Sequence, residues 1–183
     1  GLSVTARQRS STDGSGAALL WRRLFDAAAD AEVDAALRAV FAELDQQVRA
    51  RGVGCRNSGR CCRFDQFGHR LYVTGLEIAW TLTQLGMTPW HEDAPGVGAD
   101  IRPTRIDPAG ACVFQVDNRC TVHTVRPLGC RIFFCQEGTD DWQHELSERL
   151  LADLRELHDI HNLPYRYLEW RAGLAEALRV DAD

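Results

Sequence analysis

Two stretches of this sequence, CRNSGRCC (residues 55–62) and CVFQVDNRCTVHTVRPLGCRIFFC (residues 112–135), organise the interpretation of the whole chain. They hold all seven cysteines of a 183-residue protein. Most of the remaining sequence has the apolar spacing of helices, so we expect a helical scaffold that brings the two stretches together. The candidate site residues are Cys55, Cys61, Cys62, Cys112, Cys120, Cys130 and Cys135.

The second stretch predicts a β-hairpin within residues 112–126. Apolar residues alternate on both sides of Asp117-Asn118, a pair typical of tight turns. Cys112 and Cys120 are expected on opposite arms, where a hairpin can present paired metal ligands. Pro127 ends the second arm, and Cys130 and Cys135 follow it in an aromatic segment.

Helices are predicted on either side of the cysteine stretches. Thr74 and Glu77 have the spacing of a capping box, which places a helix start there. Residues 70–74 predict a short strand, and residues 87–110, rich in proline and glycine, predict a long loop. The first predicted helical region covers residues 17–50, as one helix or as two with a break near 29–32, and the second covers residues 74–85. Two further helices are predicted in the C-terminal third, one beginning near Trp142 and one near Tyr167, with a boundary between them near Asn162 and Pro164.

The predicted fold class is α+β, mostly α, with a helical scaffold around a cysteine-rich metal-binding core and a short β-hairpin. Residues 1–16 are small and polar, so we expect a disordered lead-in, followed by one domain over residues 17–183. A hydrophobic content of 45% is sufficient for a core without disulfides.

Charge and hydropathy narrow the classes of partner. The net charge of −5 gives no general attraction to nucleic acid, and no apolar run is long enough for a membrane span or a secretory signal. We therefore expect a cytoplasmic protein that binds neither nucleic acid nor membrane. All 21 basic residues are arginine, which excludes a catalytic lysine.

The cysteines have three interpretations. Disulfides are disfavoured because seven is an odd number and because a reducing compartment is expected. Adjacent cysteines such as Cys61 and Cys62 also pair poorly, since neighbouring Cα atoms lie about 3.8 Å apart. Buried thiols that act as small apolar groups would be scattered, whereas these are clustered. Metal binding is the interpretation that fits the clustering.

Arginines beside the cysteines support metal binding. A positive charge lowers the pKa of a thiol and offsets the negative charge of several thiolates around one metal. The arginines next to a cysteine, or one residue away, are Arg56, Arg60, Arg63, Arg119 and Arg131. This pattern does not distinguish zinc from an iron–sulfur cluster.

The spacing of the cysteines bears on the identity of the metal. Zinc sites usually show two short C-x₂-C pairs, which this chain lacks, whereas iron–sulfur clusters accept more varied spacing and apolar surroundings. We therefore expect an iron–sulfur cluster, with [4Fe–4S] as one form, or iron, and zinc as the alternative. Because adjacent side chains tend to diverge, Cys61 and Cys62 are not expected to serve one ion in the same way.

The order CRNSGRCC, C-x-F, C-T-V-H and RPLGCR resembles the YkgJ family of cysteine-cluster proteins, described by a CxxCxxCC-type motif as zinc- or iron-chelating. The resemblance covers about residues 55–135 and implies metal chelation through cysteines, with no settled activity. A related pattern occurs in flagellin lysine N-methylases, but this chain is too short for their methyltransferase domain, so only the cysteine site is carried over.

Ser58 stands where the family pattern has a further cysteine. Serine is a poor ligand for soft metals, which favours a single site over two sites of four thiolates. His123 is the nearest substitute ligand and His69 a weaker one. His158 and His161, at helical spacing, are expected as solvated residues at a helix end, with a hard-metal or acid–base role as the alternative.

No phosphate-binding loop or nucleophile elbow is present in the sequence. Three functions stay open at this point. The first is a redox, modification or maturation role for a metal cluster. The second is a structural zinc domain that binds a protein partner, and the third is an enzyme with iron at an open coordination position.

Overall fold

The computed structural model describes residues 13–55, 58–88, 103, 105–107, 109–133, 138–179 and 181–182. Within these residues the chain is α+β and mostly α, as predicted. The longer helices are α1 (Asp13–Ala29), α2 (Ala31–Arg51), α4 (Gly75–Gln84), α6 (Asp140–Ile160) and α7 (Trp170–Leu178). The shorter helical elements are η1 (Arg60–Cys62), α3 (Phe64–Phe67), η3 (His123–Val125) and α5 (Leu128–Ile132).

The strands form three two-stranded ribbons. The first pairs β1 (Tyr72–Thr74) with β5 (Tyr167–Glu169) antiparallel, with Val73 opposite Leu168. The second pairs β2 (Arg105–Ile106) with β6 (Asp181–Ala182) in parallel, and the third is the hairpin of β3 (Gln115–Val116) and β4 (Arg119–Cys120).

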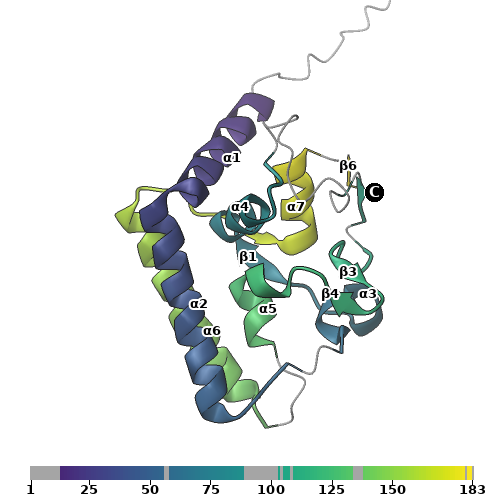
Figure 1. Cartoon of the computed structure of the whole chain (residues 1–183). Coiled ribbons are helices and arrows are strands. Elements are labelled where there is room, and N and C mark those ends of the chain that lie inside the picture. The colour runs from purple at the N-terminus through teal and green to yellow at the C-terminus, as the bar shows by residue number, and fades with distance from the viewer. Residues whose placement is uncertain are drawn as a thin grey trace, which may run out of the picture.

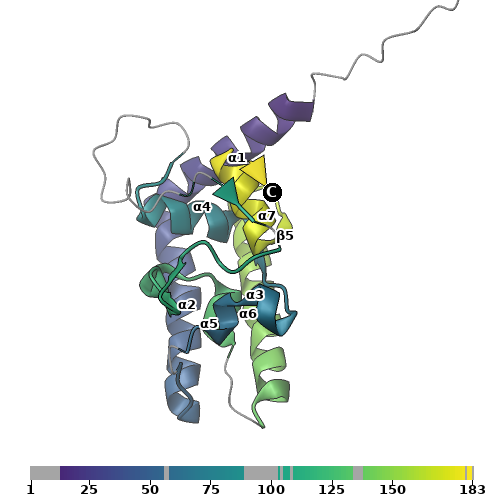
Figure 2. The ribbon, with the colours of Figure 1, turned by 90° about the vertical axis from the view of Figure 1, so that its right-hand side faces the viewer.

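The helices form two groups around a shared core. Figure 1 shows α2 and α6 side by side along one flank, with η1, α3 and the hairpin on the opposite side and α5 between them. Figure 2 views that opposite side, where α3 overlaps α6 in the projection and α2 runs along the left. The cysteine stretches pack against the helical scaffold, and parts of them, including Cys62, Cys112 and Phe114, belong to its core.

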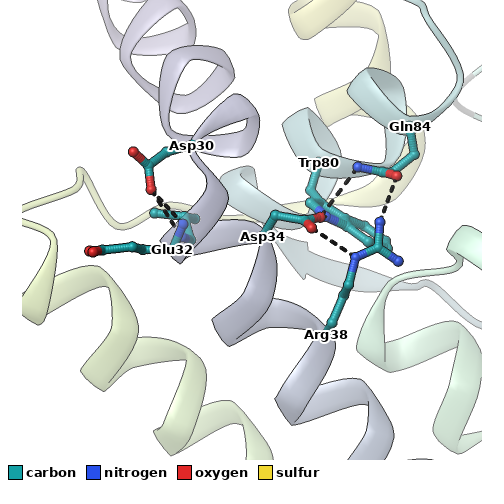
Figure 3. Close-up of polar contacts among 7 residues, drawn as sticks. Asp30, Glu32, Asp34, Arg38, Trp80 and Gln84 are labelled. Atoms are coloured by element: carbon teal, nitrogen blue, oxygen red, sulfur yellow. Dashed lines mark hydrogen bonds and ion pairs between the residues drawn. The ribbon is translucent and has the colours of Figure 1, made fainter.

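The N-terminal helical region is two helices. Asp30 separates them, because its carboxylate accepts hydrogen bonds from the backbone N–H groups of Glu32 and Val33 and so caps α2 (Figure 3). Helix α2 ends at Gly52, whose φ of 71° lies in the left-handed region. Helix α1 begins at Asp13, so the expectation of a disordered lead-in is wrong for residues 13–16, and residues 1–12 lie outside the described part.

A polar cluster joins α2 to α4. Figure 3 shows the Asp34 carboxylate accepting hydrogen bonds from Trp80 Nε1 at 2.7 Å, Arg38 Nε at 2.8 Å and Gln84 Nε2 at 3.4 Å. The hydrogen bond from Arg38 lowers the pKa of Asp34 most. Trp80 is thus held in the core by packing on one side and by a carboxylate at its edge.

Three predictions about the connecting segments need correction. Tyr167 begins strand β5 rather than a helix, because residues 167–169 supply the partner of β1. Residues 105 and 106, expected within a loop, form β2. The second hairpin arm ends at Cys120 instead of continuing to Val125, since the chain turns into η3. Most of the predicted loop 87–110 lies outside the described residues.

Among the described helices, none is long and apolar enough to cross a membrane. The core is built from apolar faces of α1, α2, α4, α6 and α7. Its fully buried members include Leu24, Leu37, Leu44, Leu76, Ile78, Leu82, Leu150 and Leu174. Burial of these side chains supplies the main favourable free energy of folding.

His158 is buried near the end of α6, so the expectation of a solvated side chain is wrong. It is 1% exposed and packs edge-on against the Tyr165 ring. Neither ring nitrogen forms a hydrogen bond of good geometry within the described part of the chain. Burial lowers the pKa of His158, and the nearby Leu163 and Pro164 carbonyl groups and Asp159 oppose this only partly.

Replacement of His158 by Phe should flatten the dependence of stability on pH. In the unfolded chain His158 has a pKa of about 6.5, whereas burial in the folded protein lowers it. As the pH falls below 6.5 the unfolded chain therefore binds a proton that the folded protein does not, so the stability of the wild-type protein rises with pH in this range. Relative to His158→Phe, the wild-type free energy of unfolding should fall by up to about 1.4 kcal/mol for each pH unit below 6.5. Urea denaturation between pH 5 and 7.5 measures this difference.

The matched control is His144→Phe, which changes an exposed histidine of the same helix. It should leave the slope of the wild-type protein unchanged. Equal slopes for wild type and His158→Phe would contradict the burial of a neutral ring.

Candidate metal centre

Four thiols from both cysteine stretches meet beside the core. Cys61 and Cys62 belong to η1, Cys112 precedes β3, and Cys120 ends β4. The Cys62 Sγ is 3.9 Å from that of Cys61, and the Cys112 and Cys120 thiols lie close enough to Cys62 to raise its pKa. The side chains of Cys61 and Cys62 therefore converge, contrary to the expectation that adjacent cysteines diverge.

A fifth thiol lies beside this group. Cys130, in α5, is half-buried. Burial, and then the negative charges of Cys112, Cys61 and Cys120, raise its pKa. Cys55 is exposed, and Cys135 lies outside the described residues. Ser58, which stands where the predicted family pattern has a further cysteine, is exposed. Within the described part of the chain, Cys61, Cys62, Cys112, Cys120 and Cys130 thus lie together or close together.

The backbone joins the two cysteine stretches directly. The Cys112 N–H donates to the Cys62 carbonyl at 2.7 Å, and Gln115 Nε2 donates to the Gly59 carbonyl at 2.8 Å. Arg63 donates to the Asn118 side-chain oxygen at the hairpin turn. These contacts hold η1 against the hairpin without any metal.

The hairpin turn and Gly59 fit each other closely. Asp117 and Asn118 have φ values of 49° and 61°, the pattern of a type I′ turn that the Asp-Asn pair predicts. Gly59 has a φ of 70°, and a Cβ at this position would stand 2.2 Å from the Asn118 carbonyl oxygen. Only glycine allows the two segments to approach this closely.

Gly59→Ala should therefore destabilise the protein by at least about 2 kcal/mol, since left-handed strain alone costs an alanine roughly 1–2 kcal/mol and a backbone clash adds to it. The measurement is urea denaturation in the presence of a chelator. Gly68→Ala is the matched control, because Gly68 has a φ of 65° with open space where the Cβ would stand. Equal losses in both variants would contradict the close approach at Gly59.

The thiols differ in their readiness to ionise. Contact with the Cys62 thiol lowers the pKa of Cys61 to about 6 and that of Cys120 to about 7, and the charge of Arg126 adds to both effects. Contact with the Cys62 thiol also lowers the pKa of Cys112. In return, the thiols of Cys112, Cys120 and Cys61, together with burial, raise the pKa of Cys62. One protonated thiol is thus surrounded by three that favour the thiolate.

Trp170 and Arg126 support these thiols from two sides. Trp170 is buried and its indole N–H donates to Cys112 Sγ at 3.3 Å. Arg126 is buried too, and its guanidinium donates to the His123 and Cys130 carbonyls at 2.9 and 3.2 Å. N–H groups and positive charge both stabilise thiolate. The sequence did not single out Trp170, which lies 58 residues from Cys112.

Glu77 fixes α5, the element that carries Cys130. Its side chain is 1% exposed; one carboxylate oxygen accepts from the Thr74 N–H and hydroxyl at 2.8 and 2.9 Å, which completes the predicted capping box. The other oxygen accepts from the Leu128 N–H at 2.7 Å, at the start of α5. Burial raises the pKa of Glu77, while these donors and Arg131 oppose the shift.

Glu77→Ala should destabilise the protein by at least about 3 kcal/mol, because it leaves the buried N–H groups of Thr74 and Leu128 without an acceptor. Glu77→Gln keeps one carbonyl oxygen and should lose roughly half as much. Chemical denaturation in a chelator measures both losses. A loss below about 1 kcal/mol for Glu77→Ala would show that the carboxylate does not hold α5.

The histidines proposed as substitute ligands have other surroundings. His69 Nε2 lies 3.1 Å from the Cys61 carbonyl oxygen, which can only accept, so this nitrogen donates. His123 is exposed, and burial of part of its ring and the charges of Arg126 and Arg131 lower its pKa. Neither contacts a thiol among the interactions described.

The thiols are gathered but not arranged around one point. In the described part of the chain, no three Cys, His, Asp or Glu side chains form a ready-made set of metal ligands. Around a tetrahedral zinc with bonds of about 2.3 Å, neighbouring sulfurs stand about 3.8 Å apart. The 3.9 Å between Cys61 and Cys62 matches such an edge. The donor types and this one separation are compatible with a thiolate-bound ion.

Comparison with models of known protein families, with curated proteins and with solved structures finds no match for this chain. The resemblance to the YkgJ family therefore stays a prediction that rests on the cysteine pattern.

Proposed function

We propose that this chain is a metal-binding protein whose centre is formed by Cys61, Cys62, Cys112 and Cys120. The observation that carries the proposal is the 3.9 Å contact between the Cys61 and Cys62 sulfurs, beside which the hairpin thiols of Cys112 and Cys120 lie close enough to shift the pKa of Cys62. A cation that replaces the Cys62 proton would meet four sulfurs, three of which already favour the thiolate. The predicted resemblance to a metal-chelating family agrees with this role.

A single tetrahedral ion is the form that the geometry supports best. The Cys61–Cys62 separation of 3.9 Å suits two thiolates on one ion, and four thiolates select zinc or iron. In a [4Fe–4S] cluster each thiolate binds a different iron, so these two side chains would have to separate. The cluster is therefore the second candidate, supported by the fifth thiol at Cys130 and by the N–H···S contact from Trp170.

The proposed role of the ion is structural. The segments around it contain only a single 3-10 turn, a four-residue helix and strands of two residues, which form few hydrogen bonds of their own. A bound ion would link these segments, and its binding free energy would add to the stability of the fold. Four thiolates leave no open position for substrate. A reducing, cytoplasmic setting would keep these thiols available.

Cys62→Ser should abolish stoichiometric metal binding and lower the melting temperature of the metal-loaded protein by at least about 5 °C, since the lost binding free energy exceeds 1–2 kcal/mol. The measurements are elemental analysis for zinc and iron, an acid-labile sulfide assay after anaerobic purification, and thermal denaturation. Ser58→Ala, in the same segment, is the matched control and should keep the metal.

The outcomes separate the two candidates. One zinc or iron per chain without sulfide supports the single ion, and iron with equimolar sulfide supports the cluster. A wild-type protein that stays metal-free in both assays, or a Cys62→Ser variant with full metal content, would contradict the proposed centre.

A further inference from the structure

A small pocket lies beside the thiol centre and belongs to no part of it. Its volume is about 250 Å³, and its walls are Arg60, Phe67, His69 and Phe133. Phe67 and Phe133 are 45% and 43% exposed, which is unusual for large apolar rings. Two lining residues connect the pocket to the backbone of Cys61. Arg60 precedes Cys61 in the chain, and His69 is hydrogen-bonded to the Cys61 carbonyl.

Arg60 supplies a positive charge without a carboxylate partner in the described part of the chain. Its guanidinium carbon lies 4.7 Å from the centroid of the Phe67 ring. The ion pairs found among the described residues involve other arginines. A guanidinium that rests on a ring keeps its N–H groups at the periphery, where a planar anion can be bound by two hydrogen bonds.

His69 is held rigidly at the pocket wall. Its ring stacks on Phe133 with 5.4 Å between centroids and an interplanar angle of 8°, and it meets Phe64 edge-on at 5.2 Å. Because Nε2 donates to the Cys61 carbonyl, Nδ1 is the ring nitrogen left for a ligand or solvent. Two aromatic contacts and one hydrogen bond thus fix the ring before any ligand arrives.

We infer that this pocket binds a small planar organic anion: one aromatic ring that carries a carboxylate. The carboxylate matches the guanidinium of Arg60, for which the described residues supply no carboxylate, and the ring matches the aromatic walls of Phe67 and Phe133. The volume of about 250 Å³ lies below the usual range for drug-sized ligands and suits a ligand with a single ring.

This inference does not depend on the proposed metal. The lining residues in the described part of the chain include no cysteine, and their mutual contacts involve no ion. A ligand in the pocket would nevertheless lie next to the backbone of Cys61, through Arg60 and His69. The pocket and the thiol centre are therefore neighbours that separate experiments can address.

The test uses benzoate and the full-length chain as purified. Binding is followed by isothermal titration calorimetry and by NMR shifts of the His69 ring protons, which a stacked ring would move. We expect a Kd of about 1 mM or lower. Cyclohexanecarboxylate, which has the charge but a saturated ring in place of the aromatic one, should bind at least about fivefold more weakly, and benzyl alcohol, which has the aromatic ring without the charge, should show no saturable binding.

Arg60→Met should weaken benzoate binding at least about tenfold, because it removes the charge and keeps much of the apolar stem. Phe67→Leu should weaken it about threefold or more by removing one aromatic wall. Arg70→Met is the matched control, since Arg70 is exposed, lies in the same segment and does not line the pocket; it should change the Kd less than twofold.

Several results would overturn the inference. These are no saturable benzoate binding, equal affinity for benzoate and cyclohexanecarboxylate, or an unchanged Kd in Arg60→Met. Binding that disappears on removal of metal but survives Arg60→Met would place the anion on the ion itself and would also overturn it. Retention of benzoate binding by Cys62→Ser would support a pocket that is independent of the metal centre.

Discussion

The buried carboxylate of Glu77 is the interaction on which the arrangement of this protein depends. It caps α4 through Thr74 and at the same time accepts the first N–H of α5 at Leu128. A carboxylate is costly to bury, so it stays only where N–H and O–H donors satisfy both oxygens. Because α5 carries Cys130 and follows directly from Arg126, this one side chain relates the helical scaffold to the thiol centre.

The region around the thiols is held by contacts between irregular segments rather than by a sheet or a bundle. A backbone hydrogen bond joins Cys62 to Cys112, and Gly59 lets η1 lie against the hairpin turn at Asn118. Phe64 and Phe114 of these segments are buried in the core, so packing as well as hydrogen bonds holds the region in place. Trp170 then connects the centre to the C-terminal helix through its bond to Cys112.

The pocket and the thiol centre are adjacent because η1, a turn of three residues, contributes to both. Arg60 lines the pocket, whereas the next two residues, Cys61 and Cys62, lie with the other thiols. His69 connects both through the Cys61 carbonyl. A ligand that orders Arg60 would therefore act on the same short turn that a metal ion would hold.

The sequence by itself determined local features whose signals lie within a few residues: the cap at Thr74, the Asp117-Asn118 turn and the clustering of cysteines. For the N-terminal helical region it left open one helix or two, and the cap at Asp30 appears only in the structure. Only the tertiary structure decided which thiols meet, since Cys61 and Cys62 converge through a 3-10 turn that spacing does not reveal. It also decided that Tyr167 begins a strand, because β5 needs β1 as its partner. The burial of His158 and the hydrogen bond from Trp170 to Cys112 likewise depend on the tertiary structure. The spacing of apolar residues along the sequence predicts helices and strands but does not reveal such contacts.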